Sequence, residues 1–337
     1  MDYTVAMQRA IALSQKGLGK CAPNPIVGAV ILDATGNIVG EGFHDRMSST
    51  DHAEVVAIKS AGDLTKGATI VVTLEPCNHT GSTGPCVQVI IDAGISTVVF
   101  AVNDPNAVAA GGADVLRAAG IKVVEGVLSE EAANANRAWL TKIAKRRPYF
   151  VWKVATTLDA KIAASDGTSK WISNDVSRSD VQRLRRESDA ILVGTNTVIA
   201  DNPHLIPRGE FSGYSRNPIR VIFGESDLPK DSKVFDSAAE TVQVKSRDLN
   251  DLVSKLNELG VRQVFVEAGS TLASAMVAAG LIDELVIYQA PALLGSGKSF
   301  YSNDFESTIK DQMRLEHIST EVLAGDVKSV YRIGAGI

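Results

Sequence analysis

The spacing of one histidine, one glutamate and two cysteines constrains this chain more than any other feature. His52 and Glu54 stand two residues apart, and Cys77 and Cys86 each follow a proline. One imidazole and two thiolates form the ligand set that Zn²⁺ takes in catalytic sites, where the fourth tetrahedral position stays open for water. Each residue alone is typical of an ordinary buried side chain, but the four together favour a metal site. We therefore predict that His52, Cys77 and Cys86 bind zinc.

Glu54 is not part of the predicted ligand set. In zinc deaminases a glutamate at this position transfers protons while water replaces an amino group on a ring carbon. The usual second half of that signature is Pro-Cys-x-x-Cys, whereas here eight residues, 78–85, separate the two cysteines. The longer spacing indicates a particular branch of these enzymes.

Composition limits the classes of partner and compartment. The net charge of −5 argues against a polynucleotide partner, because phosphate neutralisation supplies most non-specific affinity for nucleic acid. Aromatic residues make up only 5% of the chain, too few to indicate a base-stacking surface. Three cysteines in 337 residues do not form a disulfide framework. With no signal peptide and no apolar run long enough for a membrane span, we expect a cytoplasmic protein that binds neither nucleic acid nor membrane.

The chain is long enough for two domains, and its hydrophobic content of 45% suffices for two cores. Pro148 cannot continue a helix, so we place the boundary there, between domains 1–146 and 147–337. The basic run 145–147 just before it is interpreted as a solvated helix end rather than a nucleic-acid patch.

In the first domain, an initial hairpin is followed by alternating strands and helices, which predicts an α/β fold with a mixed sheet covered on both faces. Strands are predicted over residues 26–32, 38–43, 69–74, 97–102 and 122–124, and helices over 3–15, 53–60, 87–93, 113–119 and 129–144. The predicted zinc ligands then stand at one strand end and two helix starts, where sites in α/β folds usually form.

The second domain repeats strand and helix signals without repeating the first domain's sequence. Its clearest predicted strands span 149–154, 190–193, 219–223, 263–266 and 284–288. Residues 266–279 are typical of a strand, a glycine-containing turn and a helix, whose first N–H groups suit a cofactor phosphate. The segment 295–299 ends like a P-loop but lacks the first glycine, and no Gly-x-Gly-x-x-Gly follows a strand, so neither motif supports a nucleotide site.

Taken together, these motifs resemble the bifunctional riboflavin-biosynthesis deaminase/reductases over nearly the whole chain. In the first half the matching residues are Pro23-Asn24-Pro25, Gly42-Phe43-His44, His52-Ala53-Glu54, Glu75-Pro76-Cys77, Pro85-Cys86 and Asp104-Pro105-Asn106. In the second half they are Lys153, Leu158-Asp159, Trp171-Ile172, Val193-Gly194, Asp201-Asn202-Pro203 and Val266-Glu267-Ala268-Gly269.

The resemblance implies a cytidine-deaminase-like domain followed by a dihydrofolate-reductase-like domain. It implies zinc-dependent removal of an amino group from a diaminopyrimidinone ribosyl phosphate, then NADPH-dependent reduction of the ribosyl to a ribityl chain. The substrate is thus a small phosphorylated pyrimidine, and we expect the enzyme to be a homo-oligomer.

Site roles carry over by position. Glu54 is expected to transfer protons, and Lys153 to act on the sugar carbonyl or to hold the open-chain sugar, although an ordinary strand lysine fits its position nearly as well. The residues expected to bind the pyrimidine are Asn24, His44 and His79. Those expected to bind NADPH are Ala155, Trp171, Thr197, Asp201, Gly269, Ser270, Thr271, Leu272, Ala273, Ser274 and Ala275. Those expected to meet the sugar phosphate are Ser169, Arg185, Leu205, Arg208 and Glu267.

The chain departs from the family pattern near the first site. Ser82 stands where the family usually has an arginine, and Gly84 loosens the loop before Cys86. Ser48, Ala107 and Ala160 are further departures. None of these positions is a predicted zinc ligand or Glu54. The departures therefore affect the predicted phosphate binding and the rigidity of the loop rather than the deamination chemistry.

Three other functions remain open from sequence. One is an enzyme in which a single domain is competent and the other is a structural partner. Another is a zinc-stabilised binding protein, disfavoured because structural zinc sites usually close with a fourth protein ligand. A third is a deaminase acting on transfer RNA, which the acidic charge and the second domain disfavour.

Overall fold

The computed structural model of this protein describes residues 2–79, 84–106, 109–213, 216–302 and 308–334. The chain divides into two compact units, Met1–Arg146 and Arg147–Ile337, which are described separately. Ser82 and Ala107, two of the positions that depart from the family pattern, lie outside the described residues. None of the helices in the described ranges is long and apolar enough to cross a membrane.

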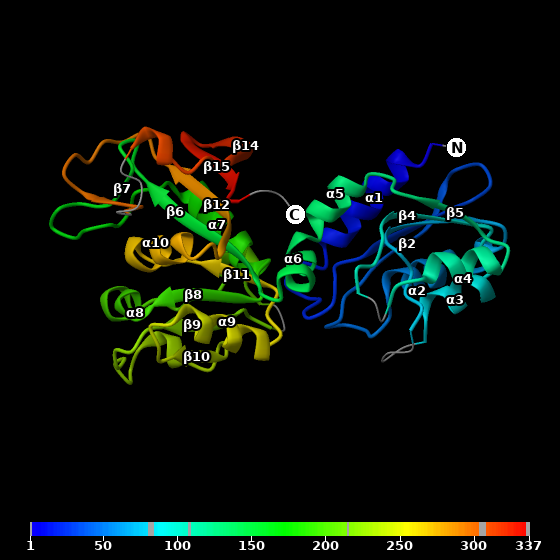
Figure 1. The fold of residues 1–337 in the computed structure, drawn as a ribbon, viewed down its shortest axis with the longest axis horizontal. Helices are drawn as coiled ribbons and strands as arrows, with labels where there is room; N and C mark the ends of the chain where they lie inside the picture. The colour runs from blue at the N-terminus through cyan, green and yellow to red at the C-terminus, as the bar shows by residue number, and fades with distance from the viewer. Residues whose placement is uncertain (1, 80–83, 107–108, 214–215, 303–307, 335–337) are drawn as a thin grey trace. The chain divides into compact units, whose positions relative to one another are not determined.

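The first unit is built on a five-stranded sheet whose order is β2-β1-β3-β4-β5 (Figure 1). These strands span Ile38–Phe43, Gly28–Leu32, Thr69–Leu74, Thr97–Val102 and Lys122–Glu125 in that order. β1 runs antiparallel to both β2 and β3, while β3, β4 and β5 are parallel. The predicted mixed sheet is therefore confirmed. The central strands β1 and β3 are largely apolar runs with both faces buried, which is typical of strands covered by helices on each side.

Helices cover both faces of this sheet, as Figure 1 shows. The helices of the unit are α1 (Thr4–Gln15), α2 (Ala53–Ala61), α3 (Cys86–Asp92), α4 (Gly112–Ala118), α5 (Ser129–Ala135) and α6 (Arg137–Lys145). The second, third and fourth share one core with alternate side chains of the sheet, and α1 and α5 share another with the opposite face. At Gly42 on β2, a Cβ would lie 2.4 Å from the carbonyl oxygen of Ala53. This glycine lets the start of α2, with His52 just before it, lie directly on the sheet.

One predicted element of the first unit is wrong. The helix expected over residues 129–144 is two helices, α5 and α6, which meet at Asn136. Asn136 has non-helical angles of φ −99° and ψ 15°, and its carboxamide oxygen accepts a hydrogen bond from the backbone N–H of Ile26 at 3.2 Å. Because that partner is 110 residues away in sequence, helical periodicity alone could not reveal the break.

The second unit is built on an eight-stranded sheet of order β10-β9-β8-β11-β6-β12-β15-β14. These strands span Thr241–Val244, Ile219–Phe223, Ala190–Gly194, Gln263–Val266, Tyr149–Thr156, Ile282–Gln289, Asp326–Arg332 and Glu316–Leu323 in that order. The first six are parallel, and β15 and β14 complete the sheet antiparallel. A separate antiparallel pair is formed by β7 (Lys161–Ala163) and β13 (Lys298–Ser299), so the P-loop-like segment 295–299 ends in a strand and opens no helix.

Among the described residues, four helices pack on this sheet. They are α7 (Asp175–Arg186), α8 (Thr195–Asp201), α9 (Leu249–Glu258) and α10 (Ser270–Ala278). The main core lies between the sheet and α9 and α10, and includes Phe150, Leu192, Leu256 and Met276. Short 3₁₀ helices span Gly62–Thr65 in the first unit and Gly209–Phe211, Lys233–Phe235 and Ile309–Asp311 in the second.

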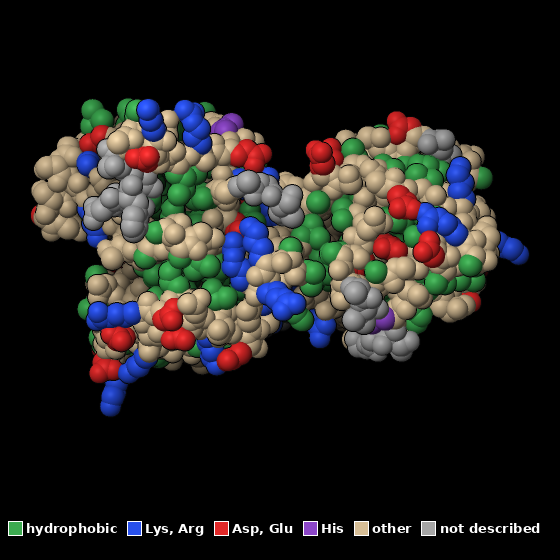
Figure 2. Space-filling model, in the orientation of Figure 1, with side chains coloured by type: hydrophobic (Ala, Val, Ile, Leu, Met, Phe, Trp, Pro, Cys, Tyr) green, Lys and Arg blue, Asp and Glu red, His purple; other side chains and the backbone are tan. Residues whose placement is uncertain are grey.

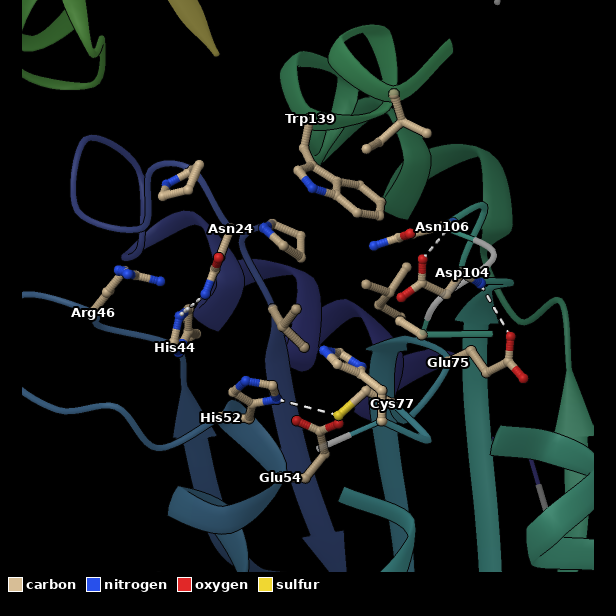
Figure 3. Close-up of a pocket in the computed structure, with 17 residues that line it drawn as sticks. Asn24, His44, Arg46, His52, Glu54, Glu75, Cys77, Asp104, Asn106 and Trp139 are labelled. Carbon is tan, nitrogen blue, oxygen red and sulfur yellow. Dashed lines mark hydrogen bonds between the residues drawn. The ribbon is translucent and has the colours of Figure 1, made fainter. Parts of the chain in front are cut away.

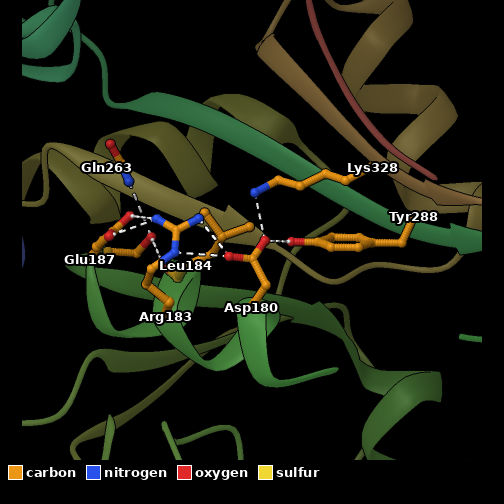
Figure 4. A network of polar contacts seen from close by, with 8 residues as sticks. Asp180, Arg183, Leu184, Glu187, Gln263, Tyr288 and Lys328 are labelled. Carbon is orange, nitrogen blue, oxygen red and sulfur yellow. Dashed lines mark hydrogen bonds and ion pairs between the residues drawn. The ribbon is translucent and has the colours of Figure 1, made fainter. Parts of the chain in front are cut away.

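A partly buried polar network fixes α7 to the antiparallel edge of the sheet (Figure 4). The carboxylate of Asp180 accepts hydrogen bonds from the hydroxyl of Tyr288 at 2.6 Å and the ammonium of Lys328 at 2.5 Å. Its other oxygen pairs with Arg183, which also contacts Glu187. Burial alone would raise the pKa of Asp180, but Lys328, Tyr288 and Arg183 together lower it, so the carboxylate stays ionised.

The face that Figure 2 shows carries Lys and Arg side chains intermixed with Asp and Glu. Polynucleotide-binding proteins usually gather their basic residues on one face or along one groove. On this face most basic side chains stand beside acidic ones, and a group of Lys and Arg side chains stands near the middle of the view.

Replacing Asp180 should reveal the cost of leaving the charges of this network unpaired. In Asp180→Asn, the ammonium of Lys328, whose side chain is 10% exposed, loses its charged partner. Breaking a buried ion pair from one side costs about 3–5 kcal/mol, so the free energy of unfolding should fall by about that amount. Calorimetry of the full chain would measure it. The double variant with Lys328→Met should lose less than the sum of the two single changes, and strictly additive losses would contradict the assigned pairing.

Candidate active sites

The three predicted zinc ligands meet at one end of the first unit's sheet. His52 immediately precedes α2, Cys77 follows β3, and Cys86 is the first residue of α3. The Nδ1 atom of His52 lies 3.2 Å from the sulfur of Cys86 and 3.6 Å from that of Cys77. All three donor atoms lie within 4.8 Å of one another.

This geometry fits a tetrahedral zinc ion. Zn–N and Zn–S bonds of about 2.0 and 2.3 Å place neighbouring donor atoms about 3.5 Å apart, close to the two distances between His52 and the cysteines. A hydrogen bond from the Cys86 thiol lowers the pKa of Cys77 to about 4, so a thiolate is available at neutral pH, which is the form that binds metal. His52, Cys77 and Cys86 are therefore suited to hold zinc with one coordination position left for water.

Glu54 is held beside this cluster in the first turn of α2. Its side chain is only 4% exposed, yet it lines the same cavity as His52 and Cys77 (Figure 3). Burial raises the pKa of its carboxyl group, and the neighbouring His52 partly opposes that rise. A carboxyl group with a raised pKa exchanges protons more readily near neutral pH, as a general acid–base group requires.

The cavity above the cluster has a volume of about 350 Å³, the size of a small-molecule site. All three residues predicted to bind the pyrimidine, Asn24, His44 and His79, line it. Mainly because of burial, the pKa of His44 is lowered, and its Nδ1 lies 2.9 Å from the carbonyl oxygen of Asp51. Nδ1 of His79 is buried without a hydrogen-bond partner among the described residues. These groups offer hydrogen bonds to a polar ring.

Several further residues line this cavity that sequence reasoning did not assign to the site. Trp139 and Ile143 come from α6, and Arg46 follows β2 by three residues. Glu75 and Asp104 line the side across from Arg46 in Figure 3. Glu75 and the stretch 104–106 belong to the matched motifs, so those motifs could have indicated them, whereas the α6 residues carry no local signal.

A second cavity, of about 480 Å³, lies at the carboxyl ends of the parallel strands β6, β8 and β11. Most of the residues predicted to bind cofactor or sugar phosphate line it, together with Lys153, which was predicted to act on the sugar. They are Lys153, Ala155, Ser169, Trp171, Arg185, Thr197, Asp201, Leu205, Arg208, Glu267 and Gly269. The structure therefore gathers residues that are more than 100 positions apart in sequence around one opening.

Glu267 organises the floor of this cavity. Its buried carboxylate accepts a hydrogen bond from Arg185 at 2.7 Å and pairs with the ammonium of Lys153 at 3.3 Å. Burial alone would raise the pKa of Glu267, but Arg185 and Lys153 outweigh it and lower the pKa to about 2. The stabilisation from this depressed pKa is complete above the ordinary glutamate value and is lost as the pH falls toward 2. Lys153 is thus held in place by a fixed carboxylate.

The predicted cofactor turn divides into an accessible and a buried part. Gly269 lines the cavity, and α10 begins at Ser270. The N–H of Ala273 already donates to the carbonyl oxygen of Gly269, so within the helix only the N–H groups of Ser270, Thr271 and Leu272 lack an acceptor four residues before them. Ser270, Ala273 and Ser274 are buried, with exposures of 5%, 0% and 8%, and of the predicted cofactor turn only Gly269 lines the cavity among the described residues. A phosphate at this turn would meet the first three amides of the helix.

An aromatic and ionic rim surrounds the mouth of the second cavity. Trp171 is 69% exposed, and the guanidinium of Arg178 lies 4.7 Å from the centre of its ring. Asp201 forms an ion pair with Lys170 at 3.0 Å. Of these, Arg178 and Lys170 were not assigned from sequence; Arg178 belongs to a helix in which four arginines within nine residues cannot be told apart by pattern.

Family models match both halves of the chain. Residues 2–102 match the cytidine and deoxycytidylate deaminase zinc-binding region. Residues 148–329 match the RibD C-terminal domain. The two matches fall in different structural units.

Curated relatives and solved structures match almost end to end. The chain is 43% identical over 324 residues to the riboflavin biosynthesis protein RibD of Mycobacterium tuberculosis, covering 96% of this chain and 95% of that protein. It is 38% identical to RibD of Escherichia coli, covering 86% of this chain and 88% of that one. The structure of Acinetobacter baumannii RibD matches with a TM-score of 0.89 and 35% identity over 98% of this chain and 99% of that one. A Thermotoga maritima structure titled as a diaminohydroxyphosphoribosylaminopyrimidine deaminase and 5-amino-6-(5-phosphoribosylamino)uracil reductase matches with the same score, identity and coverage.

The position of Cys77 depends on a close approach between α4 and the end of β3, which gives a test of the metal site. A Cβ at Gly112 would lie 1.9 Å from the carbonyl oxygen of Pro76, so Gly112→Ala should displace Pro76 and Cys77. Metal analysis of protein purified without chelators should find about one zinc per chain in the wild type. The Gly112→Ala variant should contain clearly less.

Gly84→Ala is the matched control for this test. A Cβ at Gly84 meets no atom of the described residues within 4 Å, although this residue also lies in the loop between the two cysteines. Its zinc content should equal that of the wild type. Wild-type protein without zinc would refute the metal site, and equal zinc in both alanine variants would refute the role of the close approach.

Proposed function

This chain belongs to the RibD family of riboflavin-biosynthesis enzymes, in which a deaminase domain is fused to a reductase domain, and from that premise we propose its substrate and its catalytic residues. The first substrate is 2,5-diamino-6-ribosylamino-4(3H)-pyrimidinone 5′-phosphate, which residues 1–146 deaminate by hydrolysis. Residues 147–337 then reduce the ribosyl group to a ribityl chain with NADPH. We further propose a cytoplasmic homo-oligomer, a state that stays a prediction.

The observation that carries the first reaction is the convergence of His52, Cys77 and Cys86 with Glu54 in one cavity. Zinc bound by the three ligands supplies a Lewis acid that lowers the pKa of water. Glu54 takes a proton from the attacking water and delivers it to the departing amine, so that ammonia leaves and a ring carbonyl remains. Asn24, His44 and His79 hold the ring with hydrogen bonds.

For the second reaction, we propose that Lys153 holds the sugar where it receives hydride. NADPH supplies that hydride, while Lys153, fixed by Glu267, donates a hydrogen bond to the sugar oxygen on which negative charge develops. Ser169, Arg185, Leu205 and Arg208 face the sugar phosphate, for which a guanidinium fork is a good match. Ala155, Trp171, Thr197, Asp201 and the start of α10 receive the cofactor.

Glu54→Gln should separate the two activities. The amide cannot accept or deliver the proton, so deamination should fall by a factor on the order of 10²–10⁴. Reduction should remain nearly unchanged when the deaminated substrate is supplied, because the two candidate sites lie in different units. Product masses with and without NADPH would measure both steps. An equal loss of reduction in a folded, zinc-loaded variant would contradict the two-site assignment.

Ser270→Asp should weaken cofactor binding selectively. A carboxylate in the first turn of α10 would repel a cofactor phosphate, so titration should show a strongly raised dissociation constant for NADPH while deamination stays unchanged. Ser270→Asn is the matched control, because it has nearly the same shape without the charge. Arg208→Ala should instead weaken the sugar phosphate by about 1.5–3 kcal/mol with little effect on NADPH. NADPH binding that is the same in the Asp and Asn variants would refute the phosphate assignment of this turn.

A further inference from the structure

The deaminase cavity holds few cationic groups for a phosphorylated substrate. Among the described residues that line it, Arg46 is the one Arg or Lys side chain. It lies on the segment between β2 and His52, two residues after His44. Figure 3 shows its guanidinium turned toward Asn24 and His44, both predicted to contact the pyrimidine.

Arg46 is also free to bind an anion. It is exposed, and it forms no ion pair or hydrogen bond with any residue in the described part of the chain. Other cations on neighbouring segments are already paired: Lys20 with Asp45 at 3.5 Å, and Lys59 with Asp51 at 2.7 Å. The positive charge of Arg46 is therefore unmatched at the edge of the cavity.

The opposite side of the cavity is acidic. Glu75 accepts hydrogen bonds from the backbone N–H groups of Asp104 and Ala113, which fixes its carboxylate. Burial and the nearby Glu75 raise the pKa of Asp104, a sign that additional negative charge is unfavourable there. Figure 3 shows both acidic side chains across the cavity from Arg46. A phosphate dianion would be repelled by this side and attracted to the other.

We propose that Arg46 recognises the substrate's phosphate in the deaminase cavity and determines its preference for phosphorylated over unphosphorylated pyrimidine nucleosides. The inference rests on the proposed function, since it assigns a contact within the same reaction. The reacting ring then lies at Glu54 and the ligand cluster, and the ribosyl phosphate extends past Asn24 and His44 to the guanidinium.

The experiment compares two substrates on matched variants of the full-length, zinc-loaded protein. The substrates are the diaminopyrimidinone ribosyl phosphate and its dephosphorylated nucleoside, and the readout is ammonia release. The loss of one charge-assisted contact corresponds to a rise in KM of about ten- to a hundredfold. Arg46→Ala should show that rise for the phosphate only, with kcat retained and with unchanged KM for the nucleoside. Arg46→Lys should recover part of the loss, because it keeps the charge but not the fork.

Arg9→Ala is the matched control for net charge. Arg9 is an arginine of the same unit that pairs with Glu41 at 2.6 Å and does not line the cavity, so this variant should behave as wild type. The unfolding temperature and the zinc content of each variant establish that it is folded and loaded. If Arg46→Ala fails this check, Arg46→Gln takes its place.

The outcomes separate this proposal from the one it rests on. A wild type that prefers the phosphate together with an Arg46→Ala variant that has lost the preference supports the assignment. An unchanged KM for the phosphate in Arg46→Ala, or an equal loss on both substrates, overturns it while leaving the deaminase function in place. A zinc-loaded wild type that deaminates neither compound refutes the proposed function itself, and the phosphate assignment with it.

Discussion

Three side chains carried by three different elements have to meet within 4.8 Å at one edge of the first sheet. His52 reaches this position only because α2 lies directly on β2, a contact that Gly42 permits. Cys77 reaches it only because α4 approaches the end of β3 closely at Gly112. Both contacts are between backbone atoms, where no side-chain rotation could relieve an added methyl group. The geometry of the ligand cluster is therefore a consequence of sheet–helix packing, and Glu54, two residues after His52, takes its position from the same contact.

The second unit positions its site by buried charge instead. Glu267 has two cationic partners, Arg185 from α7 and Lys153 from β6, and holds the helix and the strand at a fixed separation below the cavity. A second carboxylate, Asp180, lies five residues before Arg185 on α7. It links the helix to β12 and β15 through hydrogen bonds from Tyr288 and Lys328. Paired charges of this kind add little net stability but are costly to break, so they favour one placement of α7 over others.

The sequence allowed prediction wherever a feature was local. Buried strands such as β3 consist almost entirely of β-branched residues, and the zinc ligands form a motif of fixed residue types. Both could therefore be identified from the amino-acid sequence alone. The break at Asn136 could not, because its cause is a hydrogen bond to Ile26 from the other end of the unit. Arg46 and Trp139 were missed for a related reason: a cavity wall is assembled from segments whose convergence only the fold determines.

In both cavities, the cation best placed to attract a phosphate is one whose charge is not already matched by a carboxylate, and the arginines of the second cavity differ in this respect. Arg185 lies in the cavity, but Glu267 already matches its charge, so it offers hydrogen bonds to an anion with little net attraction. Lys153 shares that carboxylate, and Lys170 is paired with Asp201. Arg208 forms no ion pair with any residue of the described ranges and is exposed at the cavity's edge, as Arg46 is in the first unit. A phosphate that must be attracted from water, rather than only oriented once bound, therefore favours Arg208 over Arg185 as its principal partner.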